Sequence, residues 1–189
     1  MEARADAAQR TRESILQAAY DCWSELDYDE VSLEQIAARA GVTKQTVIRV
    51  FGSKDQLAYA TAAWQRPREE SQRLVEPGDV AAAIDVLVTS YERMGDANVR
   101  VLALEKRVPA IGYLLDQARK SHRGWVERVF KPFLPKRKGA SYERRVMAFY
   151  AATDVTGWKL LRRDFGLSQR DTAAVMLTLA SSLAEKGAD

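Results

Sequence analysis

The side chains best suited to recognise another molecule are gathered just after Thr43. A short helix there would place Val47, Val50 and Phe51 on its inner face, because these apolar residues recur at helical spacing. The outer face would then carry Lys44, Gln45, Thr46, Ile48 and Arg49. An α-helix fits the major groove of double-stranded DNA, where base edges present hydrogen-bonding groups. The spacing therefore predicts a DNA-recognition helix.

Three of these side chains have distinct partners in the groove. Arg49 can donate two hydrogen bonds to guanine O6 and N7, and Gln45 can pair with adenine N6 and N7. Ile48 can offer only apolar contact to a thymine methyl group or a sugar. We therefore expect Gln45 and Arg49 to read bases and Ile48 to pack beside them.

A preceding short helix would hold the recognition helix in place. Its inward-facing residues, with those of the turn, are Ile36, Ala40 and Val42. Ala37 is small where the two helices would approach closest, and Gly41 stands where the turn needs a positive φ. This register predicts a helix-turn-helix over residues 33–52. The alternative is a helical hairpin with a solvated outer face, which would not need all these features in register.

Polar residues that cap helices mark where the N-terminal helices begin. Ser32 to Gln35 and Ser53 to Gln56 both match the capping-box pattern, and Thr43 can cap the recognition helix. The second box would open a helix that runs through Trp64. A longer helix from about Ala8 to Leu26 precedes them, with an apolar stripe formed by Ile15, Ala19, Cys22 and Leu26.

Helical periodicity continues to the end of the chain, with Pro67 and Pro77-Gly78 as interruptions. Helices are predicted at about 79–94, 98–105, 109–133, 142–165 and 169–186, with Gly166 and Ser168 between the last two. No pair of alternating strands is evident, so the fold class is all-α. We expect a three-helix helix-turn-helix DNA-binding domain (1–52), a connecting helix (53–66) and a larger ligand-binding and dimerisation domain (67–189).

Composition narrows the class of protein. Hydrophobic residues make up 47% of the 189 and charged residues 29%, as in soluble globular proteins, and no run is apolar enough to span a bilayer. The N-terminus lacks the apolar core of a signal peptide, and the single Cys22 excludes an internal disulfide. We expect a cytoplasmic protein with no membrane partner.

The few reactive residues argue against an enzyme. His122 is the only histidine, so no zinc-ligand set and no nucleophile–histidine–carboxylate pattern can be recognised. We expect no cofactor, no metal and no catalytic residue. His122 lies among Arg119, Lys120 and Arg123, which predicts a solvated polar face.

Charge is distributed unevenly around the predicted DNA-binding segment. Residues 1–66 carry 8 Lys and Arg against 10 Asp and Glu, although the whole chain has a net charge of +3. Between residues 39 and 55, however, four basic residues face only one acid. These are Arg39, Lys44, Arg49 and Lys54, with Asp55 opposing them. A local positive face of this kind favours contact with phosphate.

Residues 12–57 resemble the tetracycline-repressor-like (TetR) family of bacterial transcription regulators. The similarity rests on Ile15-Leu-Gln-Ala-Ala19, Tyr28-Asp-Glu-Val-Ser32, Ile36-Ala-Ala-Arg-Ala-Gly-Val42 and Phe51-Gly-Ser-Lys-Asp-Gln-Leu57. The resemblance implies phosphate contacts from Ser32, Thr43 and Lys54, and major-groove contacts from Lys44, Gln45, Thr46 and Arg49. The chain departs from the family at Asp27, Gln45, Ile48 and Val50; at Ile48 a tyrosine that would bind phosphate is missing.

The last two predicted helices favour a homodimer. The final helix is apolar around nearly its whole circumference, and one domain core covers only one side. The helix before it offers small residues that permit close approach. The candidate interface residues are Ala152, Gly157, Met176, Ala180 and Leu183. A buried internal helix is the alternative. Resemblance of residues 157–168 to the segment joining dimerisation helices also points to a two-fold dimer.

Aromatic residues of the C-terminal domain predict a pocket for a small-molecule effector. A mostly apolar cavity with a few polar groups is typical of such sites. The candidates are Tyr91, Tyr113, Trp125, Phe149, Tyr150 and Asp154. Residues of this kind at helical spacing can also be ordinary core, and the family resemblance, which implies an inducer there, is the stronger argument. Two functions remain open: a ligand-responsive repressor, and a constitutive DNA-binding or architectural dimer with no effector.

Overall fold

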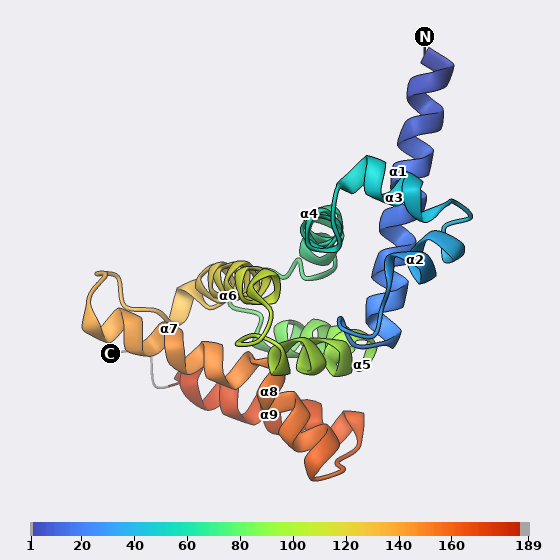
Figure 1. The fold of residues 1–189 in the computed structure, drawn as a ribbon. Coiled ribbons are helices and arrows are strands. Elements are labelled where there is room, and N and C mark those ends of the chain that lie inside the picture. Colours follow the sequence, from blue (N-terminus) through green and yellow to red (C-terminus); the bar gives the residue numbers. More distant parts are fainter. Residues whose placement is uncertain (1, 186–189) are drawn as a thin grey trace. The chain divides into compact units, whose positions relative to one another are not determined.

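Helices account for all the regular secondary structure in residues 2–185, the part of the chain described by the computed structural model (Figure 1). They are α1 Glu2–Glu25, α2 Leu33–Arg39, α3 Lys44–Phe51, α4 Lys54–Gln72, α5 Val80–Ala103, α6 Pro109–Val129, α7 Ala140–Thr153, α8 Val155–Lys159 and α9 Gln169–Glu185. A 3₁₀ turn covers Lys131–Phe133, and a π-helical turn covers Leu160–Asp164. The predicted all-α class is confirmed. None of the helices in this range is long and apolar enough to cross a bilayer.

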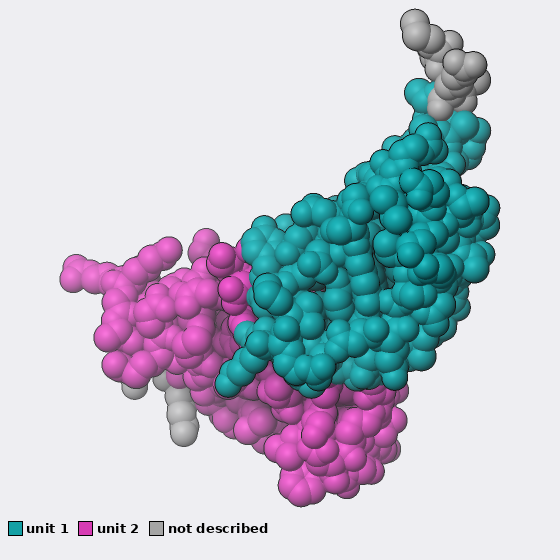
Figure 2. All heavy atoms as spheres, in the orientation of Figure 1, with its two compact units in different colours: residues 1–69, 100–114 teal, residues 70–99, 115–189 magenta. Residues whose placement is uncertain are grey.

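The chain divides into two compact units, coloured separately in Figure 2. Unit 1 comprises Met1–Glu69 and Arg100–Leu114, and unit 2 comprises Glu70–Val99 and Leu115–Asp189. Helices α4, α5 and α6 each have residues in both units. Residues 100–114 therefore group with the N-terminal unit, whereas the sequence had placed them in the C-terminal domain.

The core of unit 1 joins α1 to the two short helices that follow it. Ile15, Ala19 and Cys22 of the predicted α1 stripe are buried, but Leu26 is 41% exposed just beyond the helix end. α1 begins at Glu2 rather than near Ala8. Ile36 of α2, Val47 of α3 and Leu57 of α4 complete this core, so the amphipathic patterns of all four helices converge on one apolar cluster.

The core of unit 2 is built from α5, α6, α7 and α9, with α7 and α9 lying side by side in Figure 1. The rings of Phe130 and Phe149 stack with their centroids 4.2 Å apart. Trp158 of α8 is fully buried among these helices. Met176 and Ala180 of α9 belong to the same cluster, so one face of the last helix is buried inside the subunit.

Two predicted helix breaks are absent. Pro67 lies inside α4, which continues beyond it to Gln72. Gly95 lies inside α5, where the predicted helices 79–94 and 98–105 form one element. An added Cβ at Gly95 would lie 2.3 Å from Trp158 Cζ3. That glycine allows the indole to approach the helix and does not end it.

One helix break was not predicted. The expected helix 142–165 ends at Thr153, and Asp154 is extended, with φ −76° and ψ 148°. Its side chain accepts a hydrogen bond from the Thr156 backbone N–H at 2.9 Å and so caps α8. Aspartate is among the preferred N-cap residues, which explains the break. α9 begins at Gln169 as predicted, after Gly166 with φ 69° and the Ser168 cap; the predicted end at Lys186 lies outside the described residues.

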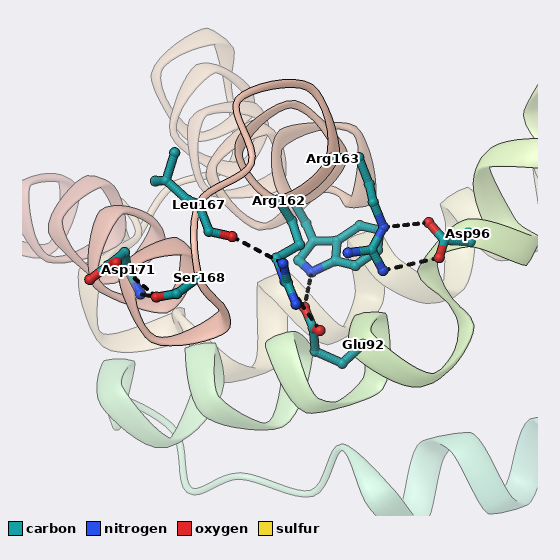
Figure 3. Close-up of polar contacts among 8 residues, drawn as sticks. Glu92, Asp96, Arg162, Arg163, Leu167, Ser168 and Asp171 are labelled. Atoms are coloured by element: carbon teal, nitrogen blue, oxygen red, sulfur yellow. Dashed lines mark hydrogen bonds and ion pairs between the residues drawn. The ribbon is translucent and has the colours of Figure 1, made fainter.

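Two ion pairs hold the segment after α8 against α5 (Figure 3). Glu92 accepts hydrogen bonds from Trp158 Nε1 at 3.0 Å and Arg162 Nε at 2.9 Å. One turn further along α5, Asp96 binds Arg163 through two hydrogen bonds of 2.8 and 3.0 Å. Bidentate pairs of this kind fix orientation as well as distance. The π-helical turn is therefore positioned by charges on α5, over the site where Gly95 admits Trp158.

Candidate nucleic-acid interface

The recognition helix is held by local caps and by its apolar inner face. Thr43 accepts a hydrogen bond from the Thr46 backbone N–H at 3.2 Å, which confirms the predicted cap. Gly41 has φ 69°, and the backbone N–H of Val42 donates to Ala37 at 2.9 Å, so the turn closes as the sequence predicted. Val47 is 1% exposed, and its burial directs the opposite side of α3 outward.

Three long side chains of the predicted DNA face are exposed. They are Lys44, Gln45 and Arg49, which share one side of α3. Thr46 and Ile48 are half-buried beside them. These five residues are therefore the outward side chains of α3 that a DNA groove could meet.

Much of the predicted positive face is neutralised within the chain. Arg39 forms a two-hydrogen-bond pair with Glu25 of α1, at 2.6 and 2.9 Å. Lys44 Nζ lies 2.6 Å from Glu34 Oε1, and this hydrogen bond holds the pKa of Glu34 below its usual range. Arg39 thus links α1 to α2, and it is not free to bind phosphate. The structure limits the free positive charge of α3 to its Arg49 end.

Lys54 is engaged at the start of α4. Its Nζ donates to the Tyr28 carbonyl oxygen and lies 4.3 Å from the centroid of the Tyr28 ring. Tyr28 Oη in turn donates to Asp55 Oδ1 at 2.5 Å. Burial lowers the pKa of Lys54 and raises that of Tyr28. Lys54 thus fastens the α1–α2 loop to α4, and a phosphate contact would compete with this bond.

Ser32 and Arg49 differ in how much of their bonding capacity is used. Ser32 Oγ accepts from the Gln35 backbone N–H at 3.2 Å, and Gln35 Oε1 accepts from the Ser32 backbone N–H at 2.6 Å. This completes the predicted capping box and leaves the hydroxyl proton for another acceptor. Among residues 2–185, Arg49 has no ion pair or side-chain hydrogen bond. Its guanidinium is the basic group of α3 most available to a base.

The predicted effector residues divide into three groups. Tyr91, Trp125, Tyr150 and Asp154 gather around His122 within unit 2. Phe149 is fully buried in the apolar core beside them. Tyr113 belongs to unit 1, is 55% exposed and packs edge-on against Tyr59, so it lies apart from the others. The prediction that Tyr113 lines the pocket is therefore wrong, because α6 turns this side chain towards Tyr59 of α4.

His122 is buried, contrary to the solvated face that its neighbours in sequence predicted. Only 8% of its surface is exposed, and its ring stacks on Trp125 at 5.6 Å and meets Tyr150 edge-on at 4.7 Å. Its Nε2 lies 3.1 Å from Thr153 Oγ1, while Nδ1 is buried with no hydrogen-bond partner among the described residues. Burial lowers the pKa of His122 to about 4. The sequence could not reveal this, because adjacent charges on a helix point to other faces.

Two of the five residues predicted to form a dimer interface are turned into the subunit. Met176 and Ala180 are 1% and 0% exposed and lie in the core, so neither can meet a partner directly. Ala152, Gly157 and Leu183 are half-buried. The apolar side chains that α7 and α9 do expose are Met147 at 44%, Val175 at 36% and Leu179 at 51%. α9 therefore buries one face inside the subunit and exposes Val175 and Leu179 elsewhere on its surface.

The chain is similar to known bacterial regulators. Residues 15–61 match the family described as bacterial regulatory proteins, tetR family. A transcriptional repressor of Mycobacterium tuberculosis and a transcriptional regulator of Mycobacterium bovis, both of the helix-turn-helix type, are each 33% identical over 113 residues. The match covers 56% of this chain and 57% of each relative, so the chain spans little more than half the length of these relatives.

Solved structures share the fold. A TetR-family regulator from Mesorhizobium loti superposes with a TM-score of 0.65 at 17% identity, over 95% of this chain and 97% of that one. A TetR-family regulator from Streptomyces coelicolor has a TM-score of 0.52 at 20% identity, over 94% and 96% of the two chains. The shared fold therefore extends well beyond the helix-turn-helix segment.

Proposed function

We propose that this chain, whose residues 15–61 match the TetR family of bacterial regulatory proteins, is a repressor which a small molecule releases from its operator. The family consists of DNA-binding transcriptional regulators and not of enzymes. The observation that carries the DNA-binding half is the exposed face of α3, where Lys44 and Gln45 accompany Arg49, which has no ion pair or side-chain hydrogen bond within the described part of the chain.

Two features support the effector half of the proposal. Two predicted pocket residues, Trp125 and Tyr150, pack against one buried histidine in unit 2, the unit that holds most of the C-terminal chain. In addition, His122 Nδ1 and Arg73 Nε are buried without hydrogen-bond partners in the described part of the chain. Buried polar atoms without partners cost free energy, and such atoms are found where a ligand or water completes the bonding.

The second candidate function is a constitutive DNA-binding dimer whose C-terminal helices serve only for association. The exposed apolar side chains of α7 and α9 support dimerisation under either function. The two functions differ in whether a small molecule changes operator affinity. Allosteric coupling between two sites is typically about 1–3 kcal/mol, and it must be reciprocal.

The test begins with DNA selected from a random pool by the purified protein, which defines the operator. Small molecules are then screened for an increase in melting temperature, because a compound bound only by the folded state must raise it. We expect at least one stabilising compound to weaken operator binding about 5–150-fold. A compound that binds tightly but leaves operator affinity unchanged would favour the constitutive dimer. Failure to select any DNA would refute both functions.

A further inference from the structure

The end of α1 and the loop that follows it are rich in carboxylates. Four of the six residues from 25 to 30 are acidic: Glu25, Asp27, Asp29 and Glu30. Carboxylates at a helix C-terminus add to the partial negative charge of the carbonyl groups there, which is unfavourable. The loop also leads directly into Ser32, the cap of α2 and a predicted phosphate contact. Its charge therefore bears on both folding and DNA binding.

Three successive residues of this loop are each bound by a cation from another segment. The pairs are Asp27 with Arg100, the Tyr28 carbonyl with Lys54, and Asp29 with Arg107. All six residues belong to unit 1. Two of the cations come from residues 100–107, which end α5 and lead towards α6. The loop between α1 and α2 is thus held from outside the helix-turn-helix segment.

The pair of Asp27 and Arg100 is the better enclosed of the two ion pairs. The Arg100 side chain is 32% exposed, against 72% for Arg107. Arg100 Nε lies 2.9 Å from Asp27 Oδ1 and both atoms are buried, although the N–H is not aligned for a hydrogen bond. Arg100 Nη2 also donates to the Ser24 carbonyl at 2.8 Å, one of those that the end of α1 leaves free. One guanidinium therefore neutralises Asp27 and caps α1.

Asp27 is connected to α2 through its own backbone. Its carbonyl accepts hydrogen bonds from the N–H groups of Glu30 at 3.0 Å and Val31 at 3.2 Å. Val31 is 1% exposed, and the next residue, Ser32, caps α2. Holding Asp27 therefore holds the turn that leads into α2. Because α2 and α3 share one apolar core, the placement of the recognition helix depends on this turn as well.

We propose that Arg100 is a positioning residue for operator binding: it acts through Asp27 and the Ser24 carbonyl, which keep α2 and α3 in the arrangement that binds DNA. This assignment rests on the DNA-binding half of the proposed function. It gives a role to Asp27, one of the positions at which the sequence departs from the tetracycline-repressor-like pattern. It also assigns a role to Arg100, which sequence reasoning did not place in the site.

The sign of one effect separates this role from that of charge alone. Asp27→Asn removes a negative charge from the loop before α2, and weaker repulsion of phosphates should raise the affinity for any duplex. In the proposal the same change releases Arg100 and loosens the turn into α2. Affinity for an operator duplex selected from a random pool should therefore fall about fivefold or more. A gain in affinity would overturn the proposal.

Arg100→Gln tests the other partner. Operator affinity should again fall about fivefold or more, while the slope of log affinity against log salt stays unchanged, because no phosphate contact is lost. A direct contact with phosphate would instead reduce that slope by about one unit. The double variant Asp27→Asn/Arg100→Gln should bind no more weakly than Arg100→Gln, since both changes break the same interaction. Additive losses or a reduced slope would overturn the positioning role.

The matched control is Arg107→Gln, which breaks the more exposed ion pair of the same loop. Exposed pairs contribute little, so operator affinity should change less than about twofold. An equal loss in both arginine variants would assign the effect to net charge and refute the proposal.

Melting curves complete the test, because they establish that each variant is folded at the temperature of the titration. A lower melting temperature with unchanged operator affinity of the folded protein would make Arg100 a stabilising residue only and refute its positioning role. That result would leave the proposed function intact, whereas a wild-type protein that selects no DNA would refute both.

Discussion

Arg49 differs from the other basic residues near the recognition helix, because it has no ion pair or side-chain hydrogen bond to any residue that the structure describes. Lys44 is bound to Glu34, Arg39 to Glu25, and Lys54 to the Tyr28 carbonyl. A paired lysine must give up its partner to reach phosphate, so part of its contact energy is lost to that exchange. Arg49 gives up no partner, and its planar guanidinium suits bidentate contact with guanine.

Replacing Arg49 by alanine should therefore relax base preference at one or two operator positions, by roughly 1–3 kcal/mol. Wild type and variant should bind scrambled DNA alike. Lys54→Ala should weaken all sequences nearly equally and reduce the slope of log affinity against log salt by about one unit per contact. Titrations of operator and scrambled duplexes at several salt concentrations measure both effects.

The control for these titrations is Arg66→Ala, an exposed arginine on α4. It should change neither base preference nor the affinity for operator beyond a small salt-dependent loss. If Lys54→Ala changes base preference while Arg49→Ala changes only the salt slope, the recognition helix is oriented differently from our proposal.

His122 makes stability depend on pH in a defined window. Its pKa is about 4 in the folded chain and about 6.5 when unfolded, so the folded state binds fewer protons between these values. The free energy of unfolding should rise with pH from about 4 to 6.5 and level off above that, with a total contribution of about 3 kcal/mol. Urea unfolding of wild type and His122→Phe across this range isolates the effect; parallel pH profiles would contradict it.

At the scale of the residue, contacts could be predicted from the sequence where the two groups lie close together along the chain. The caps at Ser32, Thr43 and Ser168 were predictable because each acts on a backbone group three residues away. The pair between Glu25 and Arg39 joins two helices, and its existence depends on how they cross. The environment of His122 was mispredicted for the same reason, since its partner Thr153 lies on another helix.

At the scale of the element, Gly95 shows that one residue can have two opposite interpretations. A glycine between helical patterns predicts a break, because it favours the unfolded chain. In α5 the glycine instead makes room for Trp158, which lies across the helix and donates to Glu92. Periodicity predicted both halves of α5, but the indole that requires the glycine is 63 positions away and left no local signal.

Gly95→Ala should therefore destabilise the protein, although alanine is the better helix former. The new Cβ would lie 2.3 Å from Trp158 Cζ3, and overpacking of this kind costs about 1–3 kcal/mol. Gly124→Ala is the matched control, because it lies inside α6 with nothing within 4 Å of an added Cβ. That change should stabilise by about 0.5–1 kcal/mol. Urea unfolding of both variants measures the contrast, and an equal gain in both would show that Trp158 does not occupy this site.

At the scale of the whole molecule, the sequence predicted the class of fold and the DNA-binding end better than the C-terminal helices. The helix-turn-helix is compact in sequence, so its core residues and turn occur within 20 positions. The last helix was predicted to be apolar around nearly its whole circumference, but periodicity alone could not assign each face. Met176 and Ala180 are buried in the core of the subunit, while Val175 and Leu179 are exposed at its surface.

That exposed face is where a second subunit should pack, and Leu179→Glu tests it. Leu179 is 51% exposed on α9, one turn after Val175, and α7, which packs beside α9, exposes Met147. In a two-fold interface the substitution introduces two carboxylates at once, and like charges brought together cost several kcal/mol. The variant should sediment as a monomer at micromolar concentration and bind operator more weakly, because a monomer contacts only one half-site.

The control is Leu74→Glu, because Leu74 is also apolar, is 71% exposed and lies outside these helices; this variant should remain dimeric. A wild-type protein that is monomeric at this concentration, or a Leu179→Glu protein that stays dimeric, would place the interface elsewhere.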